Sequence, residues 1–216
     1  FCGVSLAVGH FRTACRAELP WTDVACERCG QPLSLPLPEG AHCSDCQLHP
    51  PPFDKAFAPL VYTFPVDSAL KSLKFQRQLV YAPAFGELLL SPLAERFPDV
   101  DSLLPVPLHA RRHAVRGFNQ AAELCRPLRK QTGLPIIKNV RRVRFTEPQT
   151  GLDAAERRRN MKAAFEVRGK LYFATPLVVD DVITTGETGR QLAQALLRAG
   201  AEKVSVLAVA RSSANP

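Results

Sequence analysis

The sequence predicts an α/β protein in which a mainly parallel sheet is flanked by helices. Two stretches, 103–128 and 177–200, each have the pattern of an apolar strand, a polar loop and an amphipathic helix. The run 204–210 is apolar almost throughout, as expected for a strand that is buried on both faces. With 216 residues, the chain is long enough for one such domain and a small appendage.

The stretch 177–200 contains the most specific feature of the chain. An apolar run typical of a buried strand ends in two acids, Asp180 and Asp181. A polar loop, 184–188, comes next, and the helical pattern after it ends at Gly200. Strand, loop and helix in this order are typical of a phosphate-binding site.

The physical reason lies in the start of the helix. Its first N–H groups lack intrahelical partners and lie at the positive end of the helix dipole, so they attract anions. Gly186 allows close backbone approach, whereas the two acids suit a sugar's vicinal hydroxyls or Mg²⁺. Together they indicate a phosphorylated ribose. The alternative is an ordinary strand-to-helix turn with solvated acids; a GxxxxGK[ST] nucleotide motif does not occur in the sequence.

The segment VVDDVITTGET resembles the phosphoribosyl pyrophosphate (PRPP) motif of type I phosphoribosyltransferases, in which apolar residues precede two acids and a Thr-Thr-Gly loop. The resemblance implies a type I phosphoribosyltransferase-like fold, in which Asp180 and Asp181 are catalytic and hold the ribose hydroxyls. It implies that PRPP binds together with Mg²⁺. The residues that it implies for the 5′-phosphate are Thr184, Thr185, Gly186, Glu187 and Thr188.

Six of the seven cysteines lie in the first 46 residues. Four of them form two Cys-x2-Cys pairs that predict a tetrahedral, structural Zn²⁺ site in a small zinc ribbon: Cys26, Cys29, Cys43 and Cys46. A bound metal would supply the folding free energy that so short and proline-rich a segment lacks. Disulfides are the competing interpretation. Cys2 and Cys15 are either free thiols or, with His10, the remains of a second site.

A proline-rich hinge, 49–53, predicts a domain boundary, with the Cys-rich segment at 1–52 and the main domain at 53–216. Because the sequence opens on Phe1 rather than Met, we expect the Cys-rich segment to be truncated at its N-terminus. Beyond the hinge the patterns predict a strand over 56–64 and helices over 66–75 and 84–97. Lys74, on the first of these helices, is either a pyrophosphate ligand or an ordinary exposed lysine.

A cluster of basic residues follows the predicted strand 103–106, in the segment 108–116. Its arginines Arg111, Arg112 and Arg116 predict an anion pocket, because bases gathered after a strand can bind a phosphate together. This loop takes the place that the pyrophosphate loop has in phosphoribosyltransferases. The alternative is a solvated basic loop.

The chain as a whole resembles the ComF family. The resemblance rests on VPLHARRHAVRGFNQAAEL, on SALKSLKF before it, on the PRPP-type loop and on the Cys-rich ribbon, and it covers essentially the whole chain. It implies a phosphoribosyltransferase-related fold and an association with bacterial competence and DNA uptake. The acceptor substrate is not implied. The incomplete first cysteine cluster departs from the pattern and leaves open how many metal ions the ribbon binds.

The arginine-rich stretch 138–168 lies where type I phosphoribosyltransferases have a flap that closes over PRPP. Its patterns predict a strand over 140–145 and helical character over 152–161. A basic surface for single-stranded DNA is the alternative. The residues expected to make flap contacts are Thr146, Gln149, Arg157 and Asn160.

Composition narrows the range of functions. A net charge of +8 and a pI near 9.4 favour anionic partners. Without a transmembrane or signal segment in the sequence, we expect a cytoplasmic protein with no membrane partner. The resemblance to phosphoribosyltransferases implies transfer of a phosphoribosyl group to an unidentified acceptor with release of pyrophosphate. The alternatives are a non-catalytic DNA-uptake factor that binds single-stranded DNA or a helicase partner, and an inactive adaptor.

Overall fold

The computed structural model describes residues 11–143 and 164–213. At its centre is a five-stranded sheet whose neighbouring strands are all parallel. β7 lies in the middle of the sheet, between β6 on one side and β1 and β2 on the other, and β3 pairs with the far side of β6. The predicted, mainly parallel sheet is confirmed. The strand bounds are Ala56–Phe57 (β1), Leu60–Val61 (β2), Ser102–Pro105 (β3), Pro176–Ile183 (β6) and Ser205–Arg211 (β7).

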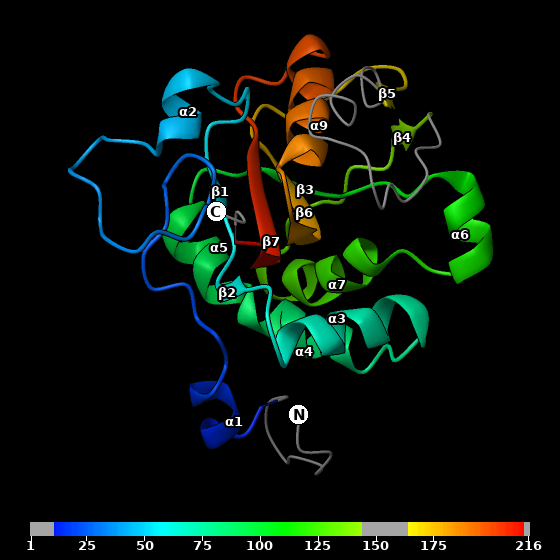
Figure 1. The fold of residues 1–216 in the computed structure, drawn as a ribbon. Helices are drawn as coiled ribbons and strands as arrows, with labels where there is room; N and C mark the ends of the chain where they lie inside the picture. Colours follow the sequence, from blue (N-terminus) through cyan, green and yellow to red (C-terminus); the bar gives the residue numbers. More distant parts are fainter. Residues whose placement is uncertain (1–10, 144–163, 214–216) are drawn as a thin grey trace.

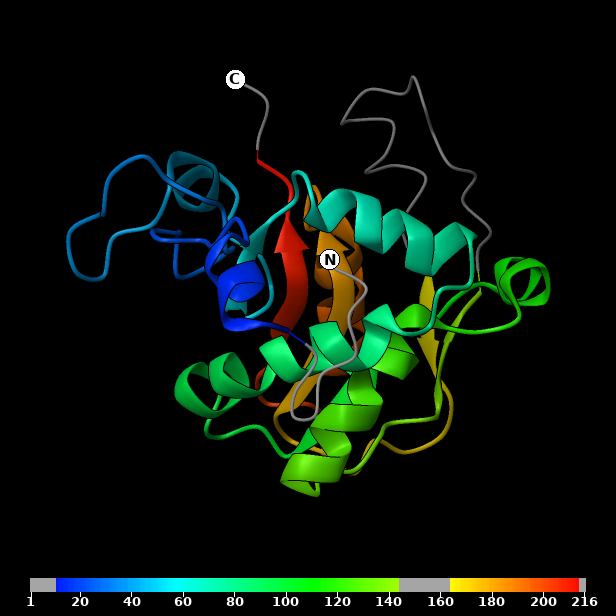
Figure 2. The ribbon, with the colours of Figure 1, turned by 90° about the horizontal axis from the view of Figure 1, so that it is seen from below.

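Helices cover both faces of this sheet, as predicted (Figures 1 and 2). α3, α4, α5 and α7 contribute to one apolar cluster, and α9 contributes to a second. A separate antiparallel pair, β4 (Val140–Arg142) and β5 (Phe165–Val167), lies beside α9. The helix bounds are Val66–Phe75 (α3), Tyr81–Leu88 (α4), Leu90–Arg96 (α5), Ala110–Arg116 (α6), Gln120–Thr132 (α7) and Glu187–Arg198 (α9).

The two faces of β6 explain why its sequence is apolar without alternation. Leu177 and Val179 point into the cluster formed with α4 and α7, whereas Val178 points into the cluster formed with α9. Successive side chains of a strand alternate between faces, so a strand covered on both sides must be apolar at every position. β7 follows the same rule, and each of its seven residues is buried.

Four predicted elements differ in the structure: β6 is longer than predicted, and prolines account for two of the other three differences. The predicted strand 56–64 is two short strands, because Pro59 has no N–H with which to continue a ladder. The predicted helix 84–97 is α4 and α5, since Pro92 in the first turn of α5 cannot donate to a carbonyl of the preceding turn.

The remaining difference concerns the basic segment, where the expected loop is largely a helix. The His109 side chain accepts a hydrogen bond from the Arg111 N–H at the start of α6, and Gly117, with φ of 79°, ends it. Arginine and alanine have high helix propensity, which favours this conformation.

The Cys-rich part lies against the edge of the sheet that β1 and β2 form. It includes α1 (Thr13–Ala17) and α2 (Ser44–Leu48), and Trp21 forms an antiparallel bridge with Leu60. In Figure 1, α2 and α6 lie at opposite ends of the molecule. None of the helices in the described part of the chain has the length and apolar character that crossing a bilayer requires.

Candidate functional site: an acidic pair and an arginine-lined cleft

A cleft of about 790 Å³, with the solvent at its mouth included, opens beside the carboxyl end of β6. Open parallel sheets place their ligand sites at this end of the strands. The side chains around the cleft come from α3, α6, α7, β4, β6 and the loop after β6. Its charged residues are Lys74, Arg112, Arg116, Arg142, Asp180 and Asp181.

The two acids lie within β6, because the strand continues to Ile183 rather than ending at Val179. Asp181 is buried; one of its oxygens accepts from the Val182 N–H at 2.9 Å, and the other lies 2.7 Å from the Lys74 ammonium. Asp180 is half-buried and accepts from the Asp181 N–H at 2.8 Å. The pair therefore presents one carboxylate that is paired with a lysine and one that borders open space.

The surroundings of the two acids shift the pKa of the neighbouring groups. Burial and the charge of Asp181 raise the pKa of Asp180 well above its ordinary value, although Lys74 acts in the opposite direction. Burial also acts to lower the pKa of Lys74, but the attraction of Asp181 outweighs it, so that this pKa is raised. Lys74 is therefore charged and held toward the acids, and it is not an ordinary exposed lysine.

Three arginines face the acids across the cleft. Arg112 and Arg116 come from α6, and Arg142 comes from β4. Burial, followed by the charge of Arg116, lowers the pKa of Arg112, and burial followed by the charge of Arg112 lowers that of Arg142. Like charges that are held together in partly desolvated positions repel one another, and a bound anion would relieve that repulsion.

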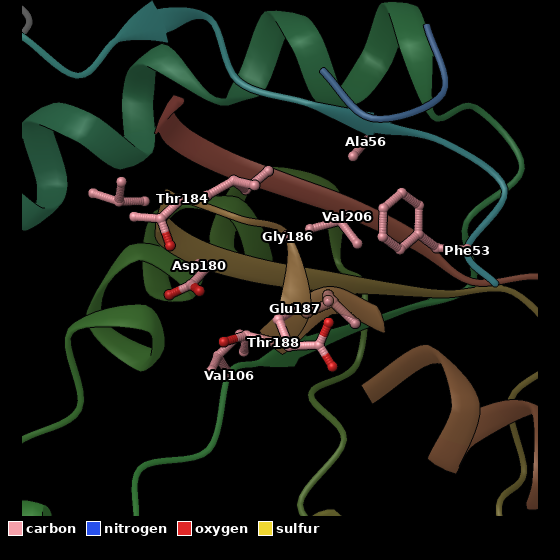
Figure 3. Close-up of a pocket in the computed structure, with 13 residues that line it drawn as sticks. Phe53, Ala56, Val106, Asp180, Thr184, Gly186, Glu187, Thr188 and Val206 are labelled. Carbon is pink, nitrogen blue, oxygen red and sulfur yellow. The ribbon is translucent and has the colours of Figure 1, made fainter. Parts of the chain in front are cut away.

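The loop after β6 borders the cleft and also a smaller hollow of about 380 Å³. Gly186 has φ of 77° at the start of α9, a conformation that non-glycine residues rarely adopt. Figure 3 shows Asp180, Thr184 and Thr188 around this hollow. The Glu187 carboxylate accepts from Gln191 at 2.9 Å, so it already has a partner within α9. The start of α9 and the acids thus lie at one place, as a ligand with both phosphate and hydroxyl groups would require.

The structure brings most of the predicted cleft residues together. Lys74, Arg112 and Arg116 line the cleft with the acids, whereas Arg111 is exposed and is not among the lining residues. Thr185 is exposed, and its hydroxyl lies 3.4 Å from the Glu187 N–H. The expected flap residues lie outside the described part of the chain; they are Thr146, Gln149, Arg157 and Asn160.

Sequence reasoning missed three lining residues: Tyr62, Gln120 and Arg142. Gln120 accepts from Arg116 at 3.1 Å and thereby fixes that guanidinium, so its place directly after the basic segment was a usable signal. Tyr62 follows a short edge strand and has no local pattern that indicates a site. Arg142 was one of many arginines in its stretch, and only the fold distinguishes it from the others.

The four predicted cysteine ligands come together in the Cys-rich part. Their sulfur atoms all lie within 4.8 Å of one another, and those of Cys29 and Cys43 are 3.6 Å apart. A tetrahedral site with metal–sulfur bonds of about 2.3 Å needs sulfur atoms about 3.8 Å apart, so the spacing suits a metal ion. Cys15 lies outside this group, and Cys2 and His10 lie outside the described residues.

The backbone also suits a thiolate site. Burial acts to raise the pKa of Cys26, but hydrogen bonds from the backbone, beginning with Cys43, outweigh it and lower that pKa. The Cys43 N–H lies 3.4 Å from the Cys26 sulfur. Burial raises the pKa of Cys29 to about 11 and also raises that of Cys46, and a bound cation would offset this cost of charging them. The four cysteines could therefore hold a metal ion.

Curated proteins of similar sequence are named for DNA utilization or competence, whereas no protein-family model matches the chain. The chain is 36% identical over 220 residues to DNA utilization protein YhgH of Salmonella typhi, which covers 98% of this chain and 95% of that protein. It is 32% identical over 196 residues to competence protein F of Haemophilus influenzae, covering 87% and 84%. With competence protein ComFC of Bacillus subtilis the identity is 28% over 209 residues, covering 92% and 83%.

Proposed function

The chain belongs to the ComF family, and we propose that it has a type I phosphoribosyltransferase-like fold that binds PRPP with Mg²⁺ in the cleft beside β6. We further propose that it transfers the phosphoribosyl group to an acceptor and releases pyrophosphate. The observation that carries this proposal is the juxtaposition of two acids, a helix N-terminus and four basic side chains around one opening. Each of these three features suits a different part of PRPP.

The 5′-phosphate would bind at the start of α9. The N–H groups of the first turn point out of the helix there, and Thr184 and Thr188 border the same hollow. Gly186, which has no side chain, leaves the approach to these N–H groups open.

The ribose would lie over the acidic pair. Vicinal hydroxyls donate to carboxylate oxygens, and Asp180 borders the open space from which they would donate. The Lys74 ammonium, 2.7 Å away, holds the Asp181 carboxylate in place, so the second acid orients the site without moving. When bound with the ligand, Mg²⁺ would supply further positive charge at the pyrophosphate oxygens.

The pyrophosphate would lie among Lys74, Arg112, Arg116 and Arg142. As the bond from the ribose anomeric carbon to the pyrophosphate oxygen breaks, negative charge develops on the departing group. Arginines that are already oriented stabilise this charge without reorganising, and the bound anion in turn reduces the repulsion among them. The new bond to the anomeric carbon comes from the acceptor.

The test is calorimetric titration of the chain with PRPP and Mg²⁺. We expect Asp180→Asn combined with Asp181→Asn to weaken binding by at least about tenfold, because charge-assisted hydrogen bonds to the ribose are lost. Asp67→Asn is the matched control, since Asp67 lies on the surface of α3 and pairs with Lys71 at 2.7 Å, away from the cleft. Unchanged affinity in the double variant would refute the ribose assignment.

A second comparison separates the two ends of the ligand. Arg112→Gln should weaken PRPP more than ribose 5-phosphate, because only PRPP carries the group that the arginines would meet. Release of pyrophosphate in the presence of candidate acceptors then decides whether transfer occurs. Binding of PRPP without release in any acceptor mixture would favour a sensor over an enzyme.

The alternative function, binding of single-stranded DNA in its uptake or use, is favoured by an exposed aromatic beside the cleft. Phe75 is 72% exposed, and the Arg116 guanidinium lies 5.3 Å from the centre of its ring. Bases stack on such rings while arginines meet the backbone phosphates. The names of the relatives given above agree with this function.

Fluorescence anisotropy with a labelled oligonucleotide tests this alternative. We expect Phe75→Ala to weaken DNA binding by about 1–3 kcal/mol and to leave PRPP binding unchanged. Tyr172→Ala is the matched control, because Tyr172 is 78% exposed and also has a cation, Lys170, 5.5 Å from its ring. Affinity must also fall steeply with salt. Equal effects of the two substitutions would contradict a specific stacking position at Phe75.

A further inference from the structure

We propose that Arg211 connects the four-cysteine group to the phosphate-binding loop, so that metal binding in the ribbon strengthens anion binding at the start of α9. The inference rests on the proposed function, because it concerns the affinity of that same loop. Arg211 is a positioning residue in this proposal, and it does not contact the reacting atoms.

Arg211 is held by the sheet at the level where β6 passes into the loop. It is paired in register with Ile183, and the next residue, Ser212, donates from its N–H to the Ile183 carbonyl at 2.9 Å. The side chain is only 6% exposed. Its guanidinium is therefore fixed inside the protein, directly beside the segment 184–188.

On one side the guanidinium reaches the Cys-rich part. One terminal nitrogen donates to the Gln31 side chain at 3.2 Å, and the Gln31 carbonyl accepts from the Cys26 N–H at 2.9 Å. Burial lowers the pKa of Arg211, and the charges of Cys29, Cys43 and Cys46 act against that decrease. Arg211 thus lies within the electrostatic reach of three of the four candidate ligands.

On the other side the guanidinium faces the loop. Its second terminal nitrogen would lie 3.8 Å from a Cβ placed on Gly186. This nitrogen and Nε are buried, and neither has a hydrogen-bond partner among the residues that the structure describes. A buried guanidinium with unsatisfied donors lowers the stability of the folded protein. These donors lie between the cysteine group and the loop 184–188.

A loaded metal site gives this buried cation a counter-charge. A divalent ion that is held by four thiolates leaves a net charge of about −2, and Arg211 is the buried cation that faces it. Loss of the metal removes the structure around Cys26 and Gln31, and Arg211 then loses its partner. The positive charge beside Gly186 would no longer be fixed, so an anion at the loop would bind more weakly.

Titration with ribose 5-phosphate, with and without bound zinc, tests this connection. For the unmodified chain we expect metal depletion to weaken binding by at least about fivefold. Arg211→Met keeps the aliphatic part of the side chain and removes its charge, so binding should be weak and independent of the metal. By reciprocity, ribose 5-phosphate should raise the metal affinity of the unmodified chain by the same factor.

Arg190→Gln is the matched control. Arg190 also links the main domain to the Cys-rich part, through the carbonyls of His49 and Pro50, but no contact of its side chain with the loop 184–188 is recorded among the described residues. This variant should keep the dependence of binding on metal. If Arg211→Met does not fold, Arg211→Lys retains the charge without the planar guanidinium and should keep only part of the dependence.

The outcomes separate this inference from the proposed function. If the unmodified chain binds ribose 5-phosphate equally with and without metal, or if Arg211→Met keeps the dependence, the connection is refuted and the ligand assignment stands. If the unmodified chain binds neither PRPP nor ribose 5-phosphate, the proposed function fails and the loop half of the inference fails with it. The metal half is then decided by chelator competition, in which Arg211→Met should lower metal affinity roughly 10- to 100-fold.

Discussion

Asp180 illustrates how a residue placed at a candidate binding site can lower the stability of the protein. Burial of its carboxylate, followed by the negative potential of the neighbouring Asp181, raises the pKa of Asp180. In the unfolded chain the same carboxylate is solvated and has an ordinary pKa of about 3.9. Protein stability is therefore lowered at neutral pH by a group whose position suits a ligand.

The raised pKa predicts how stability depends on pH. Asp180 makes a stabilising contribution to the free energy of unfolding. This contribution is fully present below the pKa of about 4 that Asp180 has in the unfolded chain, and it is lost as the pH rises through its raised pKa in the folded protein. Asp180→Asn removes this loss, so we expect the free energy of unfolding at pH 7 to increase by about 1 kcal/mol. Urea denaturation of the variant and of the unmodified chain at pH 5, 6 and 7 measures this difference in the free energy of unfolding.

The half-buried Asp67 has a pKa shift of the opposite sign and serves for comparison. Its hydrogen bond with Lys71 lowers the pKa of Asp67, so this group adds stability above its unfolded pKa and loses it as pH falls. Asp67→Asn should therefore not stabilise the protein at pH 7. A fall in stability at pH 7 for Asp180→Asn as well would show that the charged form of Asp180 is well accommodated.

At the level of elements, local patterns predicted the strand–loop–helix segment that ends at Gly200, and it is present. The prediction of β6 was too short, because two acids normally end a buried strand, whereas here they continue it into the cleft. The basic helix α6 was not predicted, since its pattern has no apolar face, and none of its residues is buried.

The site was predictable wherever a chemical motif lies in one segment. The acids, the loop and two arginines of α6 are of this kind, and the structure places them together. Arg142 and Arg211 were not predictable, because their roles depend on which strands become neighbours: β4 with β5, and β7 with β6. Arg211 follows an apolar run, and Arg142 is one of several arginines in its stretch, so neither has a local pattern that indicates a site.

We expect loss of the metal to unfold the Cys-rich part locally. Among its described residues, the buried cluster of this part consists of three cysteines, and Leu33 and Cys43 pack against it, so we expect the metal to supply most of its folding free energy. Cys26→Ser should lose the metal and unfold this part alone. Metal analysis, with amide hydrogen exchange over 20–50 and over β6 and β7, measures both effects.

The control for this prediction is Cys15→Ser, because Cys15 is half-buried but lies outside the four-cysteine group. That variant should retain the metal. Stoichiometric metal in Cys26→Ser would show that other ligands hold it, and loss of protection in β6 would show that the two parts unfold together.

The molecule as a whole carries a net charge of +8, and its basic side chains are not evenly distributed. Basic side chains gather around the cleft, where α3, α6 and β4 meet the end of the sheet, and the acids lie among them. The positive potential of the whole chain would raise the rate at which anionic ligands arrive, whereas the local arrangement decides which of them stay.

The central place of β7 has a consequence for biosynthesis. In residues 11–143 and 164–213 this strand comes last in sequence and yet pairs on both sides, with β6 and with β1 and β2. While a ribosome is still making residues 205–211, the earlier strands lack the neighbour that joins them, and their apolar edges are open to chaperones or to other nascent chains. Completion of the sheet, the cleft and the Arg211 contact must therefore wait until translation has passed β7.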